Sequence, residues 1–248
     1  VTVGRSEKMA KSKRNVVPPQ RIQDEFGADT ARMFVVSDSP PDRDLEWSEA
    51  GVQGVWKYLS RVWRLIHDMH PHCGQVGASM PESISGQDLE VRRMVHQTIH
   101  AVTKDLDNFH LNQYIARLRT LTNFLCELKN PAHLNPEVVR EAMEVFVQML
   151  NPVVPHLTEE LWEILGHQTR LSHTCWPKAS PVFLVEDVIT LAVQVNGKLR
   201  GALEIAPDLG QEEIETQALA LENVQRALEG RNVKTIIIIP KRVVNIVG

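Results

Sequence analysis

The sequence lacks long apolar runs, and it has few cysteines. Its longest uninterrupted apolar run has four residues, as in Ile236–Ile239, whereas a membrane-spanning helix needs about 20. This excludes a membrane span within the chain. Its three cysteines lie far apart, which excludes a disulfide framework and a CxxC metal knuckle. No basic-then-apolar leader opens the sequence, so we expect a protein of the reducing cytoplasm.

What remains is an ordinary globular composition with an uneven charge. Hydrophobic residues make up 43% and charged residues 23% of the 248 positions, and this length predicts one large or two modest domains. The net charge is −4, yet residues 1–21 and the last 18 residues are strongly basic. Basic ends on an acidic body predict two separate contacts with anions. Solvated basic termini are the alternative explanation.

Most of the chain shows helical periodicity. Apolar residues recur every three or four positions in 51–70, and two further segments, 88–109 and 111–129, repeat the pattern. Asn135-Pro136-Glu137 is typical of a helix start, and that helix is expected to end near Leu150. Thr158 is predicted to cap a last helix through Leu165. Four antiparallel helices with short loops form a bundle, so the fold class is mainly α.

The last 60 residues show a different pattern. Two predicted strands, 189–195 and 198–205, flank Asn196-Gly197, which favours a two-residue hairpin turn. A helix over 211–228, a buried strand over 233–239 and a strand over 242–247 complete a small α+β unit with ββαββ order. The predicted organisation is therefore a loop region with connecting helices, a helical bundle and a small C-terminal domain, with the boundaries 1–42, 43–180 and 187–248.

A basic loop near the start carries the candidate chemistry. Lys8 and Lys11 are three residues apart and are flanked by small residues. Lysine places a mobile point charge at the end of a long stem, and two such charges suit a polyphosphate whose negative charge grows during transfer. Without further context, a solvated basic loop is the better explanation of this pattern.

Longer motifs give the loop its context. Lys8–Ser12 resembles the KMSKS loop of class I aminoacyl-tRNA synthetases, with Ala10 where the family usually has serine. Gly27–Arg32 and Leu150–Trp162 are similar to the segment that follows this loop and to the helical-bundle signature. The segments that begin at Ser39 and at Val193 resemble bacterial leucyl-tRNA synthetases, and the resemblance covers essentially the whole chain.

The resemblance implies an activity for the intact enzyme. Such an enzyme uses ATP with Mg²⁺ to form leucyl-adenylate and transfers leucine to tRNA(Leu). Lys8 and Lys11 would be catalytic residues that stabilise the leaving pyrophosphate, and Met9, Ala10 and Ser12 would complete the ATP-binding loop. Ala10 offers no hydroxyl, although backbone N–H groups of the loop could still serve.

The resemblance also implies missing parts. No HIGH-type motif, Gly-rich nucleotide turn or editing domain occurs in the sequence. The chain is thus expected to be the C-terminal part of a leucine–tRNA ligase that works with N-terminal catalytic and editing domains. Alone it should be inactive and bind no cofactor. The start at Val1 favours a fragment; a subunit of a split enzyme, or a stand-alone tRNA-binding or scaffolding module, are the alternatives.

The tRNA-binding candidates are dispersed cations, which suit recognition of RNA through its backbone. They are Arg61, Arg64, Lys198, Arg200, Lys234, Lys241 and Arg242. No metal site is expected, because His96 and His100 lack a third ligand and are predicted to form a surface pair. Four tryptophans could stack on unpaired bases, but helical spacing favours a place in the core; they are Trp47, Trp56, Trp63 and Trp162.

Overall fold

The computed structural model describes residues 7–128, 130–184, 189–205, 209–228, 233–239 and 242–247. Its internal contacts divide the chain into two units, Val1–Leu184 and Val185–Gly248. Each unit has its own hydrophobic core. The finer division at residue 42 stays a prediction.

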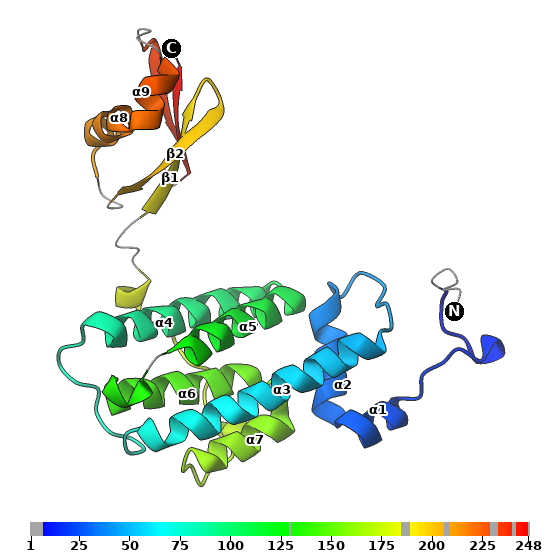
Figure 1. Cartoon of the computed structure of the whole chain (residues 1–248). Coiled ribbons are helices and arrows are strands. Elements are labelled where there is room, and N and C mark those ends of the chain that lie inside the picture. Colours follow the sequence, from blue (N-terminus) through cyan, green and yellow to red (C-terminus); the bar gives the residue numbers. More distant parts are fainter. Residues whose placement is uncertain are drawn as a thin grey trace. The chain divides into compact units, whose positions relative to one another are not determined.

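The first unit is helical, and helices α3 to α7 lie side by side as a bundle (Figure 1). This confirms the mainly α class and the helical bundle. Among the described residues, no helix is long and apolar enough to cross a membrane. The helices are α1 (Pro19–Phe26), α2 (Ala28–Asp38), α3 (Glu49–Met69), α4 (Gly86–Asp107), α5 (Leu111–Glu127), α6 (Pro136–Leu150) and α7 (Pro155–Ile164).

Side-chain caps fix where two of the bundle helices begin. The hydroxyl of Ser48 accepts a hydrogen bond from the backbone N–H of Gly51 at 3.2 Å, which starts α3. Asn135 Oδ1 accepts from the N–H of Glu137 at 3.0 Å and starts α6, as predicted. The prediction that Thr158 caps α7 is wrong. This residue lies inside the helix, and its hydroxyl donates to the carbonyl of Val154 at 2.9 Å.

The apolar stripes of the bundle helices meet in one core. Its largest fully buried side chains include Tyr114 and Phe146, from α5 and α6. The stripe of α3 is buried at Val52, Leu59 and Ile66, as its periodicity predicts. The core prediction fails for Trp56, whose side chain is 47% exposed.

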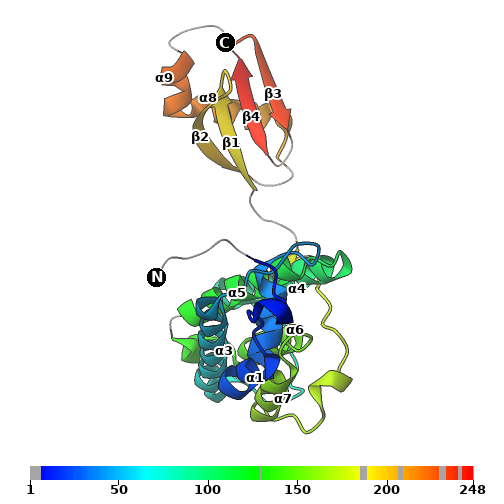
Figure 2. The ribbon, with the colours of Figure 1, turned by 90° about the vertical axis from the view of Figure 1, so that its right-hand side faces the viewer.

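The second unit is a four-stranded sheet with two helices, which confirms the small α+β domain. The strand order is β2-β1-β4-β3, with β1 and β4 parallel and the other pairs antiparallel (Figure 2). One helix was predicted between the second and third strands, but two are present, separated at Leu221. The elements are β1 (Ile189–Val195), β2 (Lys198–Ile205), α8 (Gln211–Ala220), α9 (Glu222–Leu228), β3 (Thr235–Ile239) and β4 (Val243–Val247).

Two details of the sheet concern the site. Asn196 and Gly197 have φ angles of 49° and 77°, so the predicted hairpin turn joins β1 to β2. The prediction that β3 is buried is wrong, because β3 lies at the edge of the sheet and alternate residues face away from the core. Ile237 and Ile239 are 49% and 46% exposed.

Candidate phosphate-binding loop and nucleic-acid interface

The lysine loop is held in shape by one asparagine. Lys11–Lys13 forms a single 3₁₀ turn that ends at Arg14 in the left-handed conformation, with φ 52°. Asn15 Oδ1 accepts from the backbone N–H of Ala10 at 2.8 Å, and its Nδ2 donates to the carbonyl of Lys8 at 3.4 Å. These bonds close the loop through its backbone and do not involve the lysine side chains.

The three lysines of the loop are not equivalent. Lys13 Nζ lies 2.8 Å from the Glu7 carboxylate. Lys8 and Lys11 are exposed, and neither forms an ion pair with a described residue. Their ammonium groups are therefore free to bind an anion such as a polyphosphate. The backbone N–H of Ala10 is already bonded to Asn15, so it does not replace the hydroxyl that this position lacks.

Asp29 joins α2 to α7 of the bundle. Its Oδ2 accepts from the N–H of Leu157 at 2.8 Å, and its Oδ1 lies 2.9 Å from His156 Nδ1. Nearby, Arg32 Nε donates to the carbonyl of Val153 at 3.1 Å. The two segments that carry the family resemblance in this unit are thus in direct contact.

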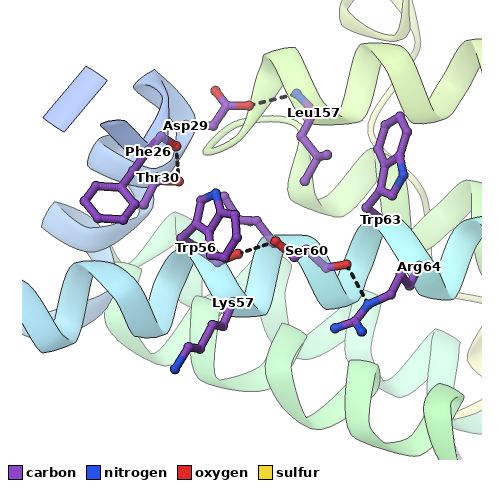
Figure 3. Close-up of a pocket in the computed structure, with 10 residues that line it drawn as sticks. Phe26, Asp29, Thr30, Trp56, Lys57, Ser60, Trp63, Arg64 and Leu157 are labelled. Carbon is purple, nitrogen blue, oxygen red and sulfur yellow. Dashed lines mark hydrogen bonds between the residues drawn. The ribbon is translucent and has the colours of Figure 1, made fainter. Parts of the chain in front are cut away.

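The two arginines of α3 that are predicted to bind tRNA differ in their hydrogen bonds and in their exposure. Arg61 Nη1 donates to Asn123 Oδ1 on α5 at 2.8 Å. Arg64 is exposed and lines a groove of about 640 Å³ between α3 and the helices α1, α2 and α7, which Lys57 also lines (Figure 3). Within the described part of the chain, Arg64 is bonded through its Nε, to the carbonyl of Ser60 at 3.3 Å, which leaves both terminal nitrogens available.

In the second unit, three predicted cations lie near one end of the sheet. Lys198 and Arg200 are at the start of β2, after the hairpin turn. Lys234 precedes β3, whose first residue pairs with Val247 at that same end. All three side chains are exposed. The hairpin end of the sheet thus forms a basic rim, defined here by Lys198, Arg200 and Lys234.

Arg242 is not part of this rim. It precedes β4, and its N–H donates to the carbonyl of Ile239 at 3.1 Å, at the other end of β3 and β4. Strand β3 runs its full length between Lys234 and Arg242, so these two cations lie at opposite ends of the sheet. Lys241 and Arg231 lie outside the described residues.

The prediction of a surface histidine pair is wrong for His96. Its ring is buried, stacks on Phe183 with centroids 4.8 Å apart, and accepts the N–H of Ser180 at Nδ1 over 3.2 Å. His100 is exposed on the same helix. Among the described residues, no group of three His, Cys, Asp or Glu side chains could hold a metal ion.

Glu141 faces this histidine and is bound by an arginine. Arg92 donates to both of its carboxylate oxygens, over 2.6 and 2.8 Å, whereas His96 Nε2 lies 3.5 Å away. Burial alone would raise the pKa of Glu141. The His96 and Arg92 groups outweigh burial and hold the pKa below its ordinary value.

Sequence reasoning missed the roles of Asn15, Asp29 and Lys57. Asn15 lies three residues after the Lys8–Ser12 motif, and Asp29 lies inside the Gly27–Arg32 motif. The hydrogen bond of Asp29 joins residues 128 positions apart, which leaves no periodic signal. Lys57 shares the helical spacing of Arg61 and Arg64 on α3. This spacing could have placed it beside Arg64, because residues seven apart lie on the same face of a helix.

Comparison with known proteins identifies the family. The family described as the anticodon-binding domain of tRNA ligase matches residues 88–216, which is just over half of the chain. The chain belongs to the tRNA ligases with this anticodon-binding domain. The family of class I tRNA synthetases for I, L, M and V matches residues 1–48, where the lysine loop lies.

The similar proteins among the tRNA ligases include leucine–tRNA ligases. The leucine–tRNA ligase of Paramagnetospirillum magneticum is 46% identical over 249 residues, which cover 100% of this chain and 28% of that protein. The leucine–tRNA ligase of Methylocella silvestris is 47% identical over 254 residues, which cover 100% of this chain and 29% of that protein. The chain thus spans less than a third of these relatives and resembles their C-terminal part.

A solved structure has a similar fold. The ternary complex of Agrobacterium radiobacter K84 agnB2 LeuRS with tRNA and LeuAMS matches with a TM-score of 0.85 and 30% identity. The match covers 97% of this chain and 31% of that protein. The predicted resemblance to the C-terminal part of bacterial leucyl-tRNA synthetases is confirmed.

Proposed function

We propose that this chain is the C-terminal, tRNA-binding part of a cytoplasmic leucine–tRNA ligase, and that it supplies a lysine loop to the site where leucine is activated with ATP. The observation that carries the proposal is the pair of exposed lysines, Lys8 and Lys11, which lack an ion-pair partner among the described residues and lie on a loop closed by Asn15. A match to relatives that are leucine–tRNA ligases supports the same activity.

The proposed role of the loop is electrostatic. When leucine attacks the α-phosphate of ATP, negative charge develops on the leaving pyrophosphate, and a positioned ammonium group lowers the energy of that state. Lys11 directly follows Ala10, whose backbone N–H donates to Asn15. Lys11 is therefore the stronger candidate for the ammonium group that stabilises the pyrophosphate, and Lys8 assists it. Met9, Ala10 and Ser12 shape the loop around the ATP phosphates.

Mg²⁺ enters this proposal only as the partner of ATP. The described residues contain no cluster of acidic, histidine or cysteine side chains that could hold the ion. Its ligands would be the ATP phosphates and residues of the catalytic domain, which we propose to be a separate part of the same enzyme, together with the editing domain. The isolated chain is proposed to be inactive.

The proposed partner of the rest of the chain is tRNA(Leu). Arg64 on the bundle and the basic rim at the end of the small sheet are exposed cations on elements of fixed geometry. Such dispersed cations suit contacts with an RNA backbone. Arg61, Arg242 and Lys241 remain candidates for further phosphate contacts, with Arg61 already bonded to Asn123.

Substitution of Lys11 tests the role of the loop. In a full-length ligase that carries this sequence, Lys11→Ala should lower the rate of leucyl-adenylate formation by about 10²–10³-fold, with little change in leucine affinity. Lys13→Ala is the matched control, because Glu7 already binds that ammonium group. Pre-steady-state adenylation at equal rates in wild type and Lys11→Ala would contradict the proposal.

A further inference from the structure

An open groove with aromatic walls crosses the first unit. It has a volume of about 640 Å³ and lies where α3 passes α1, α2 and α7 (Figure 3). Its lining combines three aromatic side chains with two cations. These side chains are Phe26, Trp56, Trp63, Lys57 and Arg64.

Two tryptophans of α3 line this groove. Trp56 and Trp63 are seven residues apart, so their Cα atoms are separated by two helical turns, about 10.5 Å. Figure 3 shows both indoles on the same side of α3, with the small Ser60 between them.

The two tryptophans differ in how they are held. Trp63 is half-buried and contacts the ring of His67, with centroids 4.5 Å apart. Trp56 is 47% exposed, and no described ring stacks on it. Exposure of so large an apolar surface costs free energy unless a ligand covers it.

The charge of the groove favours an anionic ligand. Lys57 and Arg64 lie at the edge of the groove on α3, and Figure 3 shows their cationic ends directed away from the two indoles. The single acid among the lining residues is Asp29, whose oxygens are engaged by Leu157 and His156. A ligand with a flat ring and a phosphate on either side would match this arrangement.

We propose that the groove binds one unpaired nucleotide of the tRNA, with its base stacked on Trp56 and its flanking phosphates at Lys57 and Arg64. This inference rests on the proposed function, because it names a contact of the same tRNA partner. Stacking on an aromatic side chain is tolerant of base identity, so the site contributes affinity and positioning.

The test measures tRNA(Leu) binding by the 248-residue chain over a range of salt concentrations. Trp56→Ala should raise Kd by about 5- to 150-fold, the range found when a stacking aromatic is removed, and should leave the salt dependence unchanged, since an indole releases no counterions. Arg64→Ala should flatten the salt dependence by about one phosphate contact. Trp56→Phe should keep most of the affinity.

A control variant and a second RNA ligand make the test specific. Phe109→Ala is the matched control, because Phe109 is also an exposed aromatic residue, at 64%, and lies outside the groove. A fully paired RNA duplex without a loop is the second ligand, and Trp56→Ala should bind it as wild type does. Circular dichroism of each variant checks that the fold is intact.

The outcomes separate the inference from the proposed function. If wild type binds tRNA and Trp56→Ala binds it equally well, the groove is not a nucleotide site, whereas the proposed function stands. If Trp56→Ala weakens the binding of tRNA and of the fully paired RNA to the same degree, the inference is also overturned. If wild type binds no tRNA, the proposed function itself fails, and the inference fails with it.

Discussion

Asp29 accepts a hydrogen bond from the backbone N–H of Leu157, over 2.8 Å and across 128 positions of sequence. Leu157 lies in the first turn of α7, where backbone N–H groups have no partner within the helix. The carboxylate therefore acts as a remote cap for α7 and complements the positive end of its dipole. It also fixes α2, which carries Asp29, against α7.

Removal of this carboxylate should loosen that connection. Asp29→Ala is expected to lower the free energy of unfolding by about 1–2 kcal/mol, the usual cost of losing a cap; Asp29→Asn, which keeps one acceptor, should cost less. Urea unfolding of the chain measures the change. Asp42→Ala is the control, because Asp42 is exposed and should change stability by less than about 0.5 kcal/mol. Equal stability of Asp29→Ala and Asp42→Ala would contradict the capping role.

Glu141 should make stability depend on pH in the acid range. Its pKa in the folded chain lies below the ordinary value of 4.5, so the unfolded chain binds a proton more readily. The stabilisation is therefore complete above about pH 4.5 and is lost as the pH falls through the folded pKa.

Glu141→Gln tests this dependence. At pH 7 it should be less stable than wild type by about 1.5–3 kcal/mol, because Arg92 loses a charge-assisted pair of hydrogen bonds. The difference should shrink below pH 4.5, where the wild-type carboxyl takes up a proton. Unfolding curves between pH 7 and pH 3 measure both. A difference that stays constant with pH would show that the carboxylate charge is not responsible.

The isolated chain should show no leucine-dependent exchange between ATP and pyrophosphate. The residues that would hold adenosine and leucine are not among its motifs, and free lysines alone do not form an adenylate. The measurement is exchange of labelled pyrophosphate with the purified chain, with a complete leucine–tRNA ligase as the positive control. If the chain shows exchange above background and Lys11→Ala abolishes it, the chain forms the adenylate by itself. This result would contradict the proposal that the catalytic domain is a separate part of the enzyme.

Much of the fold follows from local pattern. The stripe through Val52, Leu59 and Ile66 predicts which face of α3 is buried, and Asn196-Gly197 predicts the hairpin because both residues adopt positive φ. The sequence pattern does not show which other helices and strands pack against each element. Trp56 fits the apolar period but faces a groove, and Ile237 fits a buried strand but lies on an edge.

The candidate site was predictable to a similar degree. The residues of the lysine loop predict a phosphate-binding loop, and the place of Arg64 on α3 predicts a phosphate contact. The closure of the loop by Asn15 and the separation of Lys234 from Arg242 depend on hydrogen bonds and strand register, which become visible only in three dimensions.

Salt titration of tRNA(Leu) binding by the isolated chain measures the phosphate contacts that a tRNA-binding role requires. We expect log Kd to rise linearly with log salt, and replacement of the basic rim of Lys198, Arg200 and Lys234 by alanine to flatten the slope by about 0.7–0.9 for each phosphate that the variant no longer binds. Arg242→Ala, at the other end of β4, should release at most one phosphate. Circular dichroism should be unchanged. Absence of tRNA binding, or equal slopes for wild type and the triple variant, would contradict the assignment of this chain as the tRNA-binding part of a leucine–tRNA ligase.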